Sequence, residues 1–361
     1  MRTPIRRLAA LTVFVVGVVA ACGPGGAGDS SSPATSAGAT SSTVSGEPVT
    51  LRLGYFPNLT HATALAGIKK GIFEEALPDN VTLTPMPFNA GPEAVEAIFS
   101  GGLDATFIGP NPAINAFSKS KGEAIRIISG ATSGGAYLVV KPEITAAAQL
   151  KGKKLATPQL GNTQDVALRA WLKEQGLSSD AQGGGDVSIL PQANAQTLDT
   201  FKSGEIDGAW VPEPWATRLV QEGGGKVLVD ERDLWPNGQY VTTHLVVTPT
   251  FLKDHPDVVK ALLTGVVAAT DFVNEQPAEA QALVNEGIKD VTQKGLSDAV
   301  LAAAWPNLTF TVDPIASSLS TSADEATQLG LLDKTDLTGI YDLTLLNEVL
   351  KEAGKPEIAV P

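Results

Sequence analysis

The sequence predicts an α/β protein in which two lobes face each other across a cleft. Short β-like runs alternate with helical stretches from residue 49 onward, which is typical of largely parallel sheets covered by helices. The part of the 361-residue chain that follows residue 48 is long enough for two domains with separate cores. The order of elements in the first half also returns in the second half, which indicates two similar lobes.

Hydrophobic periodicity assigns the elements of the first half. Gly71 closes the first helix as a C-cap, and the helix at 92–99 has Ala94, Val95, Ile98 and Phe99 at helical spacing. The expected strands are 50–55, 81–88, 105–108 and 124–129, and the expected helices are 61–70, 92–99 and 112–119.

The second half alternates in the same way and then becomes mostly helical from residue 249. Its expected strands are 154–157, 187–190, 209–211 and 227–229, with helices at 162–175, 194–202 and 215–221. The helices expected in the last part are 256–274, 277–288, 297–305, 314–329 and 343–351.

An internal similarity links residues 100–113 with residues 203–216. Both stretches have Ser-Gly after a helix, an aliphatic residue, Asp, a strand with one aromatic residue and a Pro-rich turn into a helix. Coincidence between two ordinary strand-to-helix junctions is the alternative. If the similarity is real, each lobe presents strand ends and helix N-termini, where open α/β sheets bind ligands.

Cys22, the only cysteine of the chain, marks the end of a leader-like segment. Three arginines precede an uncharged run of 14 residues, shorter than the about 20 that a membrane span requires. The run ends Val19-Ala20-Ala21 before Cys22, which is typical of a lipobox. We therefore expect a lipoprotein signal peptide at 1–21 and an acylated, palmitate-type anchor at Cys22; an ordinary signal peptide with an incidental Cys22 is the alternative.

Residues 22–48 are expected to be a disordered tether, because they are rich in Gly, Ser, Ala and Thr and contain no aromatic residue. The mature protein would then be extracytoplasmic and anchored to the cell membrane by lipid.

Composition excludes several classes of function. The net charge of −13 and the lack of a basic run argue against nucleic acid as a partner. One cysteine allows no intramolecular disulfide, and the three histidines have no zinc-type spacing, so no metal and no cofactor are expected. Motifs for nucleophilic serine, phosphate-loop or zinc-protease chemistry are also missing. The residues suit holding a ligand better than transforming one.

Gly-rich and N-cap signals gather at five junctions: 55–61, 109–111, 132–135, 159–165 and 213–215. Simple helix capping explains any one of them. Free N–H groups at helix starts can also bind an anion, with help from the helix dipole. Glu213 lies beside two prolines in one junction; it could act as a general base, although a structural role is the commoner one for such a residue.

Several segments resemble one family of transport proteins, namely LGYFPN at 53–58, FIGPNP at 107–112, GNTQDVAL at 161–168, GAWVPEPW at 208–215 and TTHL at 242–245. The chain is similar to the nitrate/taurine/sulfonate family of ABC-transporter substrate-binding proteins, in its aliphatic-sulfonate-binding lipoprotein branch. The resemblance runs through most of residues 50–262.

The resemblance implies a type II periplasmic-binding-protein fold, with a ligand cleft between two α/β lobes joined by two crossovers. Lobe one would be 49–135 plus 244–361 and lobe two 136–243, with crossovers near 134–140 and 241–247. The implied function is that of a monomeric, non-enzymatic solute-binding protein that captures a small anion, an aliphatic sulfonate, for an ABC permease.

By resemblance, lobe one and lobe two each supply ligand contacts: Asn58, Thr60, His61, Asn111 and Ser133 from lobe one, and Asn162, Thr163, Gln164, Glu213 and Trp215 from lobe two. No arginine clearly belongs in this cleft, since Arg218 lies one helical turn past Trp215. Trp210 and Trp215 could shield a ligand tail, although a strand position favours the core for Trp210.

Three alternatives stand beside this interpretation. Relatives with this framework take nitrate, taurine, bicarbonate or pyrimidine precursors instead of sulfonates. A pyrimidine-synthesis-type enzyme on the same fold would use a histidine and a metal, for which His61 and His244 are the candidates. A surface module for sensing or adhesion would bind a ligand without a permease.

Overall fold

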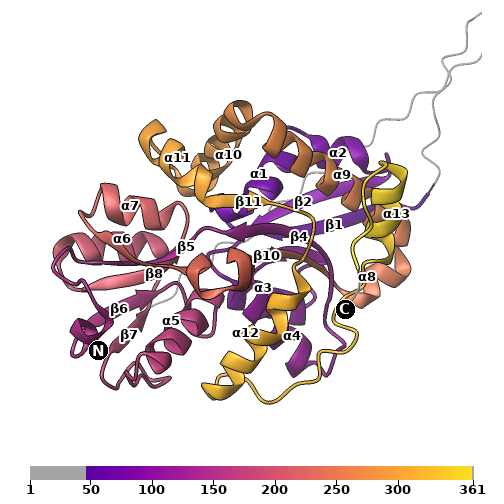
Figure 1. Ribbon diagram of the computed structural model, residues 1–361. Helices are drawn as coiled ribbons and strands as arrows, with labels where there is room; N and C mark the ends of the chain where they lie inside the picture. Colours follow the sequence, from indigo (N-terminus) through magenta and orange to yellow (C-terminus); the bar gives the residue numbers. More distant parts are fainter. Residues whose placement is uncertain (1–45, 360–361) are drawn as a thin grey trace, which may run out of the picture. The chain divides into compact units, whose positions relative to one another are not determined.

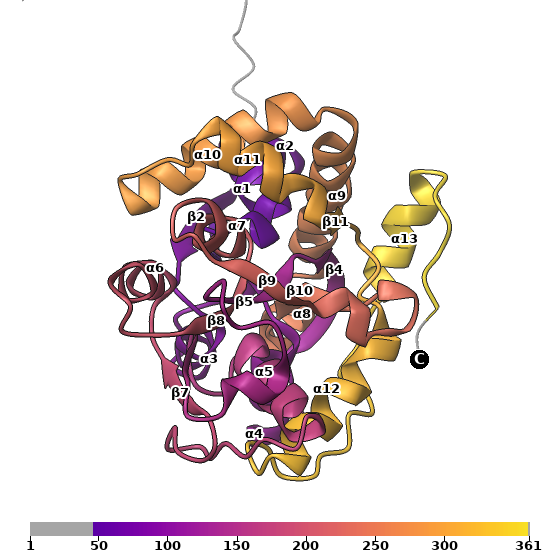
Figure 2. The same cartoon turned by 60° about the vertical axis from the view of Figure 1, so that its left-hand side comes forward.

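The computed structural model describes residues 46–359, which form two β-sheets and the helices that cover them (Figure 1). The predicted signal peptide, Cys22 and the tether as far as residue 45 lie outside the described residues. Figure 2 shows the same arrangement with the smaller sheet turned forward.

The six-stranded sheet, here called sheet A, has the order β11-β4-β10-β3-β1-β2. Its strands are β1 (Val49–Tyr55), β2 (Val81–Pro87), β3 (Ala105–Ile108), β4 (Arg126–Gly134), β10 (Val241–Val247) and β11 (Leu308–Phe310). Strands β1, β2 and β3 pair in parallel, whereas β10 runs antiparallel to both β3 and β4.

The five-stranded sheet, here called sheet B, has the order β7-β6-β8-β5-β9. Its strands are β5 (Ala136–Val140), β6 (Lys154–Thr157), β7 (Ser188–Pro191), β8 (Gly208–Pro212) and β9 (Lys226–Asp230). Strand β6 is parallel to β7 and β8, and β5 is antiparallel to β8 and β9.

Both sheets are mixed, so the expectation of largely parallel sheets is wrong. The antiparallel members include β5 and β10, the strands by which the chain enters sheet B and returns to sheet A. Parallel neighbours need a long crossover such as a helix, whereas a strand that arrives through a short link has no such requirement. The expected crossovers at 134–140 and 241–247 are mainly these two strands; the chain crosses at Gly135 and within 231–240.

The helices agree in position with the prediction, apart from two that it missed, α2 (Ile72–Ala76) and α8 (Pro249–Asp254). The others are α1 (Ala62–Lys69), α3 (Gly91–Phe99), α4 (Pro110–Lys119), α5 (Thr163–Glu174), α6 (Asn194–Ser203), α7 (Trp215–Gln221), α9 (Pro256–Glu275), α10 (Pro277–Thr292), α11 (Asp298–Ala304), α12 (Ala316–Gln328) and α13 (Thr344–Glu352). Short 3-10 turns complete the fold: η1 (Leu59–His61), η2 (Ala147–Leu150), η3 (Glu231–Leu234), η4 (Pro236–Gly238) and η5 (Trp305–Asn307).

Both faces of each sheet are buried. In β10, Leu245 and Val247 pack with α1, α9 and α10, while Val246 packs on the opposite face with α3, α4 and α12. This alternation follows from the two-residue period of a strand. In sheet B, Trp210 of β8 is fully buried and packs with Trp171 of α5, so it belongs to the core, as its strand position favours.

Within residues 46–359, none of the helices combines the length and apolar character needed to cross a membrane.

A chamber of about 260 Å³ is lined by carboxylates from three elements of the fold. Its walls include Glu174 of α5, Glu231 of η3 and Glu325 of α12. Burial raises the pKa of Glu231 to about 8, although Trp210 Nε1 donates a hydrogen bond to its Oε2 at 2.7 Å. Burial, together with Glu174, raises the pKa of Glu325 to about 7.

These raised pKa values predict that stability decreases as pH rises from about 5 to about 8, between the ordinary glutamate pKa and the pKa of the folded state. The folded protein retains protons on Glu231 and Glu325 that the unfolded chain has already released above its ordinary glutamate pKa. Each tenfold difference in proton affinity corresponds to about 1.4 kcal/mol. The melting temperature measured across this range should fall, and Glu231→Gln should flatten the decline. A flat profile for the parent protein, or an unchanged slope in Glu231→Gln, would contradict the assignment.

Candidate functional site

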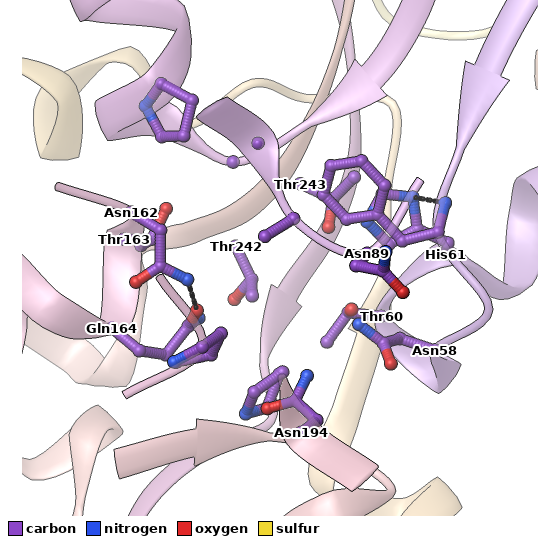
Figure 3. Close-up of a pocket in the computed structure, with 17 residues that line it drawn as sticks. Asn58, Thr60, His61, Asn89, Asn162, Thr163, Gln164, Asn194, Thr242 and Thr243 are labelled. Atoms are coloured by element: carbon purple, nitrogen blue, oxygen red, sulfur yellow. Dashed lines mark hydrogen bonds between the residues drawn. The ribbon is translucent and has the colours of Figure 1, made fainter. Parts of the chain in front are cut away.

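A polar pocket lies between sheets A and B, at the ends of their strands (Figure 3). Its cavity volume is about 30 Å³, which is space for only two or three water molecules at roughly 10–15 Å³ each. The lining residues are Phe56, Asn58, Thr60, His61, Asn89, Ala90, Gly91, Gly109, Pro112, Pro158, Asn162, Thr163, Gln164, Asn194, Pro212, Thr242 and Thr243.

The N-termini of several helices converge on this pocket. Gly109 is the N-cap of α4, Asn162 is the N-cap of α5, and His61 precedes α1. Helices α3 and α6 begin with the lining residues Gly91 and Asn194. Because each helix dipole places partial positive charge at its N-terminus, the helices together favour a negative charge in the pocket.

The side chains of the pocket are neutral. Its lining, taken over residues 46–359, contains no Lys, Arg, Asp or Glu. Burial lowers the pKa of His61 to about 3, so its imidazole is uncharged at neutral pH. The backbone N–H of Phe56 donates to His61 Nδ1 at 3.3 Å, which leaves the ring proton on Nε2. Amides, hydroxyls and helix N-termini therefore supply the polarity of the site.

A buried hydrogen-bond network fixes the start of α5. Asn162 Oδ1 accepts from the Asp165 backbone N–H at 2.9 Å, which is ordinary N-capping. The Asp165 carboxylate accepts from Thr157 Oγ1, from the Gly161 N–H and from Arg169 Nε, at 2.8 to 2.9 Å. This carboxylate joins the end of β6, the loop and the helix, and so positions Asn162 to Gln164 at the pocket.

The two sides of the pocket touch at Gly109 and Thr163. A Cβ added to Gly109 would overlap Thr163 Oγ1, so the side chain of α5 occupies the space that this glycine leaves open. The backbone of Gly109 is extended, with φ −72°. The glycine is therefore needed for the close approach and not for an unusual backbone conformation.

Six of the predicted contact residues line the pocket together: Asn58, Thr60, His61, Asn162, Thr163 and Gln164. In Figure 3 the first three lie on the sheet A side, opposite the start of α5. Their role in binding remains a prediction.

Asn111 and Ser133 are not among the lining residues. Asn111 Nδ2 donates to the Ser322 carbonyl of α12 at 3.1 Å, so this side chain joins two helices of the sheet A side. Ser133 is buried in β4 and pairs in the ladder with Val241 and Thr309.

Glu213 and Trp215 connect the two sides instead of lining the polar pocket, here also called the inner pocket. The Glu213 carboxylate accepts from Thr217 and, at 2.7 Å, from Asn307 Nδ2 of η5. Burial raises the pKa of Glu213 to about 7. Trp215 Nε1 donates to Asn58 Oδ1 at 2.9 Å. These contacts tie the turn after β8 to the sheet A side.

Sequence reasoning missed Asn89, Asn194, Thr242 and Thr243, all of which line the pocket. Asn89 follows the end of β2 and Asn194 begins α6, so the strand-end and helix-start signals used at the other junctions could have indicated both. Thr242 and Thr243 lie inside the antiparallel strand β10, for which the sequence gives no comparable signal.

His61 and His244 do not come together in one site. His244 is fully buried, its Nε2 lies 3.0 Å from the Pro314 carbonyl oxygen, and burial lowers its pKa to about 4. It is not among the residues that line the pocket with His61. In the part of the chain that the structure describes, no group of three His, Cys, Asp or Glu residues is placed to hold a metal ion.

Two α/β lobes, a chain that crosses between them and a polar pocket at the crossing define a type II periplasmic-binding-protein fold. The alkanesulfonate-binding protein SsuA from Xanthomonas axonopodis pv. citri, solved bound to MOPS, has this fold. Its TM-score to this chain is 0.67 at 20% identity, over 80% of this chain and 96% of SsuA.

The chain belongs to the NMT1-like family, whose model matches residues 45–286. The taurine-binding periplasmic protein of Escherichia coli is 30% identical over 182 residues, 50% of this chain and 54% of that protein. A Brucella abortus protein named only as a binding protein is 26% identical over 245 residues, 67% of this chain and 72% of that relative. The relatives and the fold place the chain among periplasmic solute-binding proteins.

Proposed function

We propose that the protein captures a small organic anion, an aliphatic sulfonate, in the pocket between the two sheets and delivers it to an ABC permease. The observation that carries this proposal is the convergence of helices α1, α3, α4, α5 and α6 on a neutral, polar pocket. The fold and the taurine-binding and sulfonate-binding relatives support it.

Helix N-termini favour an anion over a neutral ligand or a cation. A sulfonate presents three oxygens that accept hydrogen bonds, and the pocket offers hydroxyls, amide groups and first-turn N–H groups from both sides. Among the described residues, 46–359, no carboxylate lines the pocket to repel it. Recognition by neutral donors also explains why no arginine is needed: Arg218 pairs with Glu222 at 2.8 Å and lies outside the inner pocket.

Sheet A and sheet B, with their helices, are the lobes of the proposed binding cycle. The boundary expected at residue 243 moves to residue 240, because β10 belongs to sheet A, and the lobes are then residues 49–135 plus 241–359 and residues 136–240. We expect a ligand that contacts both lobes to select the closed state, in which Gly109 of one lobe meets Thr163 of the other. Because the contact residues come from both lobes, the free energy of ligand binding drives the closure of the lobes. We propose a monomer that is held to the cell membrane by lipid on Cys22.

Binding, rather than catalysis, is the activity that the pocket suits. His61 is its one titratable side chain within residues 46–359, and that imidazole is buried, neutral and already used in positioning Phe56. We therefore propose that the protein is not an enzyme.

A thermal-shift panel tests the proposed ligand. It contains alkanesulfonates, taurine, nitrate, bicarbonate, sulfate and a pyrimidine. A ligand at a hundred times its Kd stabilises the native state by about 2.7 kcal/mol, which raises the Tm of a chain this long by several degrees. A shift with sulfonates supports the proposal. A shift with nitrate or bicarbonate alone would make that anion the ligand in place of a sulfonate. If no anion produces a shift, the proposed anion site is overturned.

The variant Thr60→Val/Thr163→Val should weaken sulfonate binding by roughly thirtyfold, because two lost hydrogen bonds cost about 1 kcal/mol each. Thr60 accepts the bond from Thr132 Oγ1 through its backbone carbonyl, which valine retains, so the fold should be unaffected. Thr309→Val, at an exposed position of β11, is the matched control. Equal affinity in the double variant and the control would contradict the assignment of the pocket.

A further inference from the structure

A second cavity, here called the outer chamber, opens from the polar pocket. The two cavities share three asparagines, Asn58, Asn89 and Asn194. The volume of the outer chamber is about 280 Å³, against about 30 Å³ for the inner pocket. The larger part of the space between the lobes therefore lies outside the polar pocket.

The walls of the outer chamber are mainly apolar and come from both lobes, with Asp199, Arg218 and Lys294 as the charged members of the lining. Leu198 of α6 and Trp215 of α7 face Ile288 of α10 and Leu296 of the loop before α11. Leu198 and Ile288 are 4% and 3% exposed, so these walls are set by packing. The bond from Trp215 Nε1 to Asn58 Oδ1 fixes the indole, and the Arg218 guanidinium covers its ring at 4.7 Å.

Asn194, where the two cavities meet, carries an unused acceptor. Its side chain is 8% exposed, and its Oδ1 is buried without a hydrogen-bond partner among residues 46–359. Buried polar atoms are nearly always paired, so this oxygen indicates a ligand group that donates a hydrogen bond at the junction. An N–H or O–H a few bonds from the anionic head would meet it.

We propose that the outer chamber is the subsite for the carbon body of the ligand. The preferred substrate class is then an organic anion with a small head for the inner pocket, an apolar body of several carbons and a donor group near the head. This inference rests on the proposed function, since the head must occupy the inner pocket. An inorganic oxoanion such as nitrate would leave the outer chamber empty and Asn194 Oδ1 without a hydrogen-bond donor.

The test is a calorimetric titration of n-alkanesulfonates from methanesulfonate to octanesulfonate. Burial of each methylene should tighten Kd by about fourfold until the chamber is filled. Leu296→Ser, a half-buried wall position, should reduce that gain per methylene and leave methanesulfonate binding unchanged. Leu198→Ser is the second wall variant, and Leu190→Ser, an exposed leucine of β7, is the matched control.

Two sulfonates test whether a ligand group donates a hydrogen bond to Asn194 at the junction of the two cavities. 2-Hydroxyethanesulfonate and propanesulfonate have chains of the same length, and the first can donate to Asn194 Oδ1. In the parent protein the hydroxyl should compensate for the lost methyl group, and in Asn194→Ala propanesulfonate should bind more tightly than the hydroxyl probe.

The outcomes separate the two proposals. Binding of all the sulfonates with one Kd, or a chain-length gain that both wall variants retain, would overturn the outer subsite and leave the proposed function in place. Failure of every sulfonate, short or long, to bind would overturn the proposed function and the subsite with it.

Discussion

Replacement of Asp165 with alanine is expected to lower the free energy of unfolding by about 3–5 kcal/mol, the usual cost of leaving one partner of a buried ion pair unpaired. Asp165 is fully buried and Arg169 is 2% exposed, with 2.9 Å between carboxylate and Nε. The same carboxylate accepts from Thr157 and Gly161, so the substitution also leaves those donors without a partner. The start of α5 should lose its position at the pocket.

Chemical denaturation of the parent protein and Asp165→Ala measures this loss directly. Glu352→Ala is the control, because it breaks the exposed pair with Lys260 and should cost no more than about 1 kcal/mol. Asp165→Asn, which keeps the shape of the side chain, should be less destabilising than alanine. Equal costs for Asp165→Ala and Glu352→Ala would show that the buried pair does not organise this region.

Gly109→Ala is expected to weaken ligand binding by about 5- to 150-fold, since forcing a methyl group into a packed contact costs roughly 1–3 kcal/mol. The added Cβ overlaps Thr163 Oγ1 across the two lobes. Thr163 is itself 8% exposed, so its side chain has little room to turn away. The backbone of Gly109 has an ordinary φ, and the cost therefore falls on lobe closure and not on local strain.

A double-mutant cycle separates this clash from other effects. Thr163→Ala removes the overlapping oxygen and leaves the Cβ of residue 163 at an ordinary 3.5 Å from the new methyl group. Gly109→Ala/Thr163→Ala should then bind the ligand no more weakly than Thr163→Ala alone, as measured by calorimetry with circular dichroism to check folding. Additive losses would mean that the two residues do not meet in the bound state.

The positions of most elements could be predicted because they depend on local properties of the sequence. The predicted strands 105–108 and 154–157 agree with β3 and β6 to the residue, since each is a short run between turn signals. Asn162 was identified as the start of a helix because an asparagine after a strand and before an apolar helix is an N-cap by its own chemistry. For the residues of β10 the sequence predicts a crossover and no strand, because nothing local distinguishes a strand that joins a distant sheet.

Part of the site could be predicted for the same reason. Asn58, Thr60, His61 and the start of α5 follow strands, and the carboxyl ends of strands meet at the ligand-binding edge of an α/β sheet. Asn111 is predicted as a contact residue of the pocket wall, but it is not among the residues that line the pocket. Successive residues on a helix point in directions about 100° apart, so Gly109 and Pro112 border the pocket while Asn111 turns to Ser322.

By itself the sequence determined the α/β class, the order of the elements and the helix starts that supply neutral donors, because these follow from periodicity and capping between near neighbours. Only the tertiary structure decided that Gly109 meets Thr163, that β10 brings Thr242 and Thr243 to the pocket, and that α6, α7 and α10 enclose an outer chamber. Those contacts join residues far apart in the chain. They depend on sheet order and on the direction in which each side chain points, which packing sets and local sequence does not.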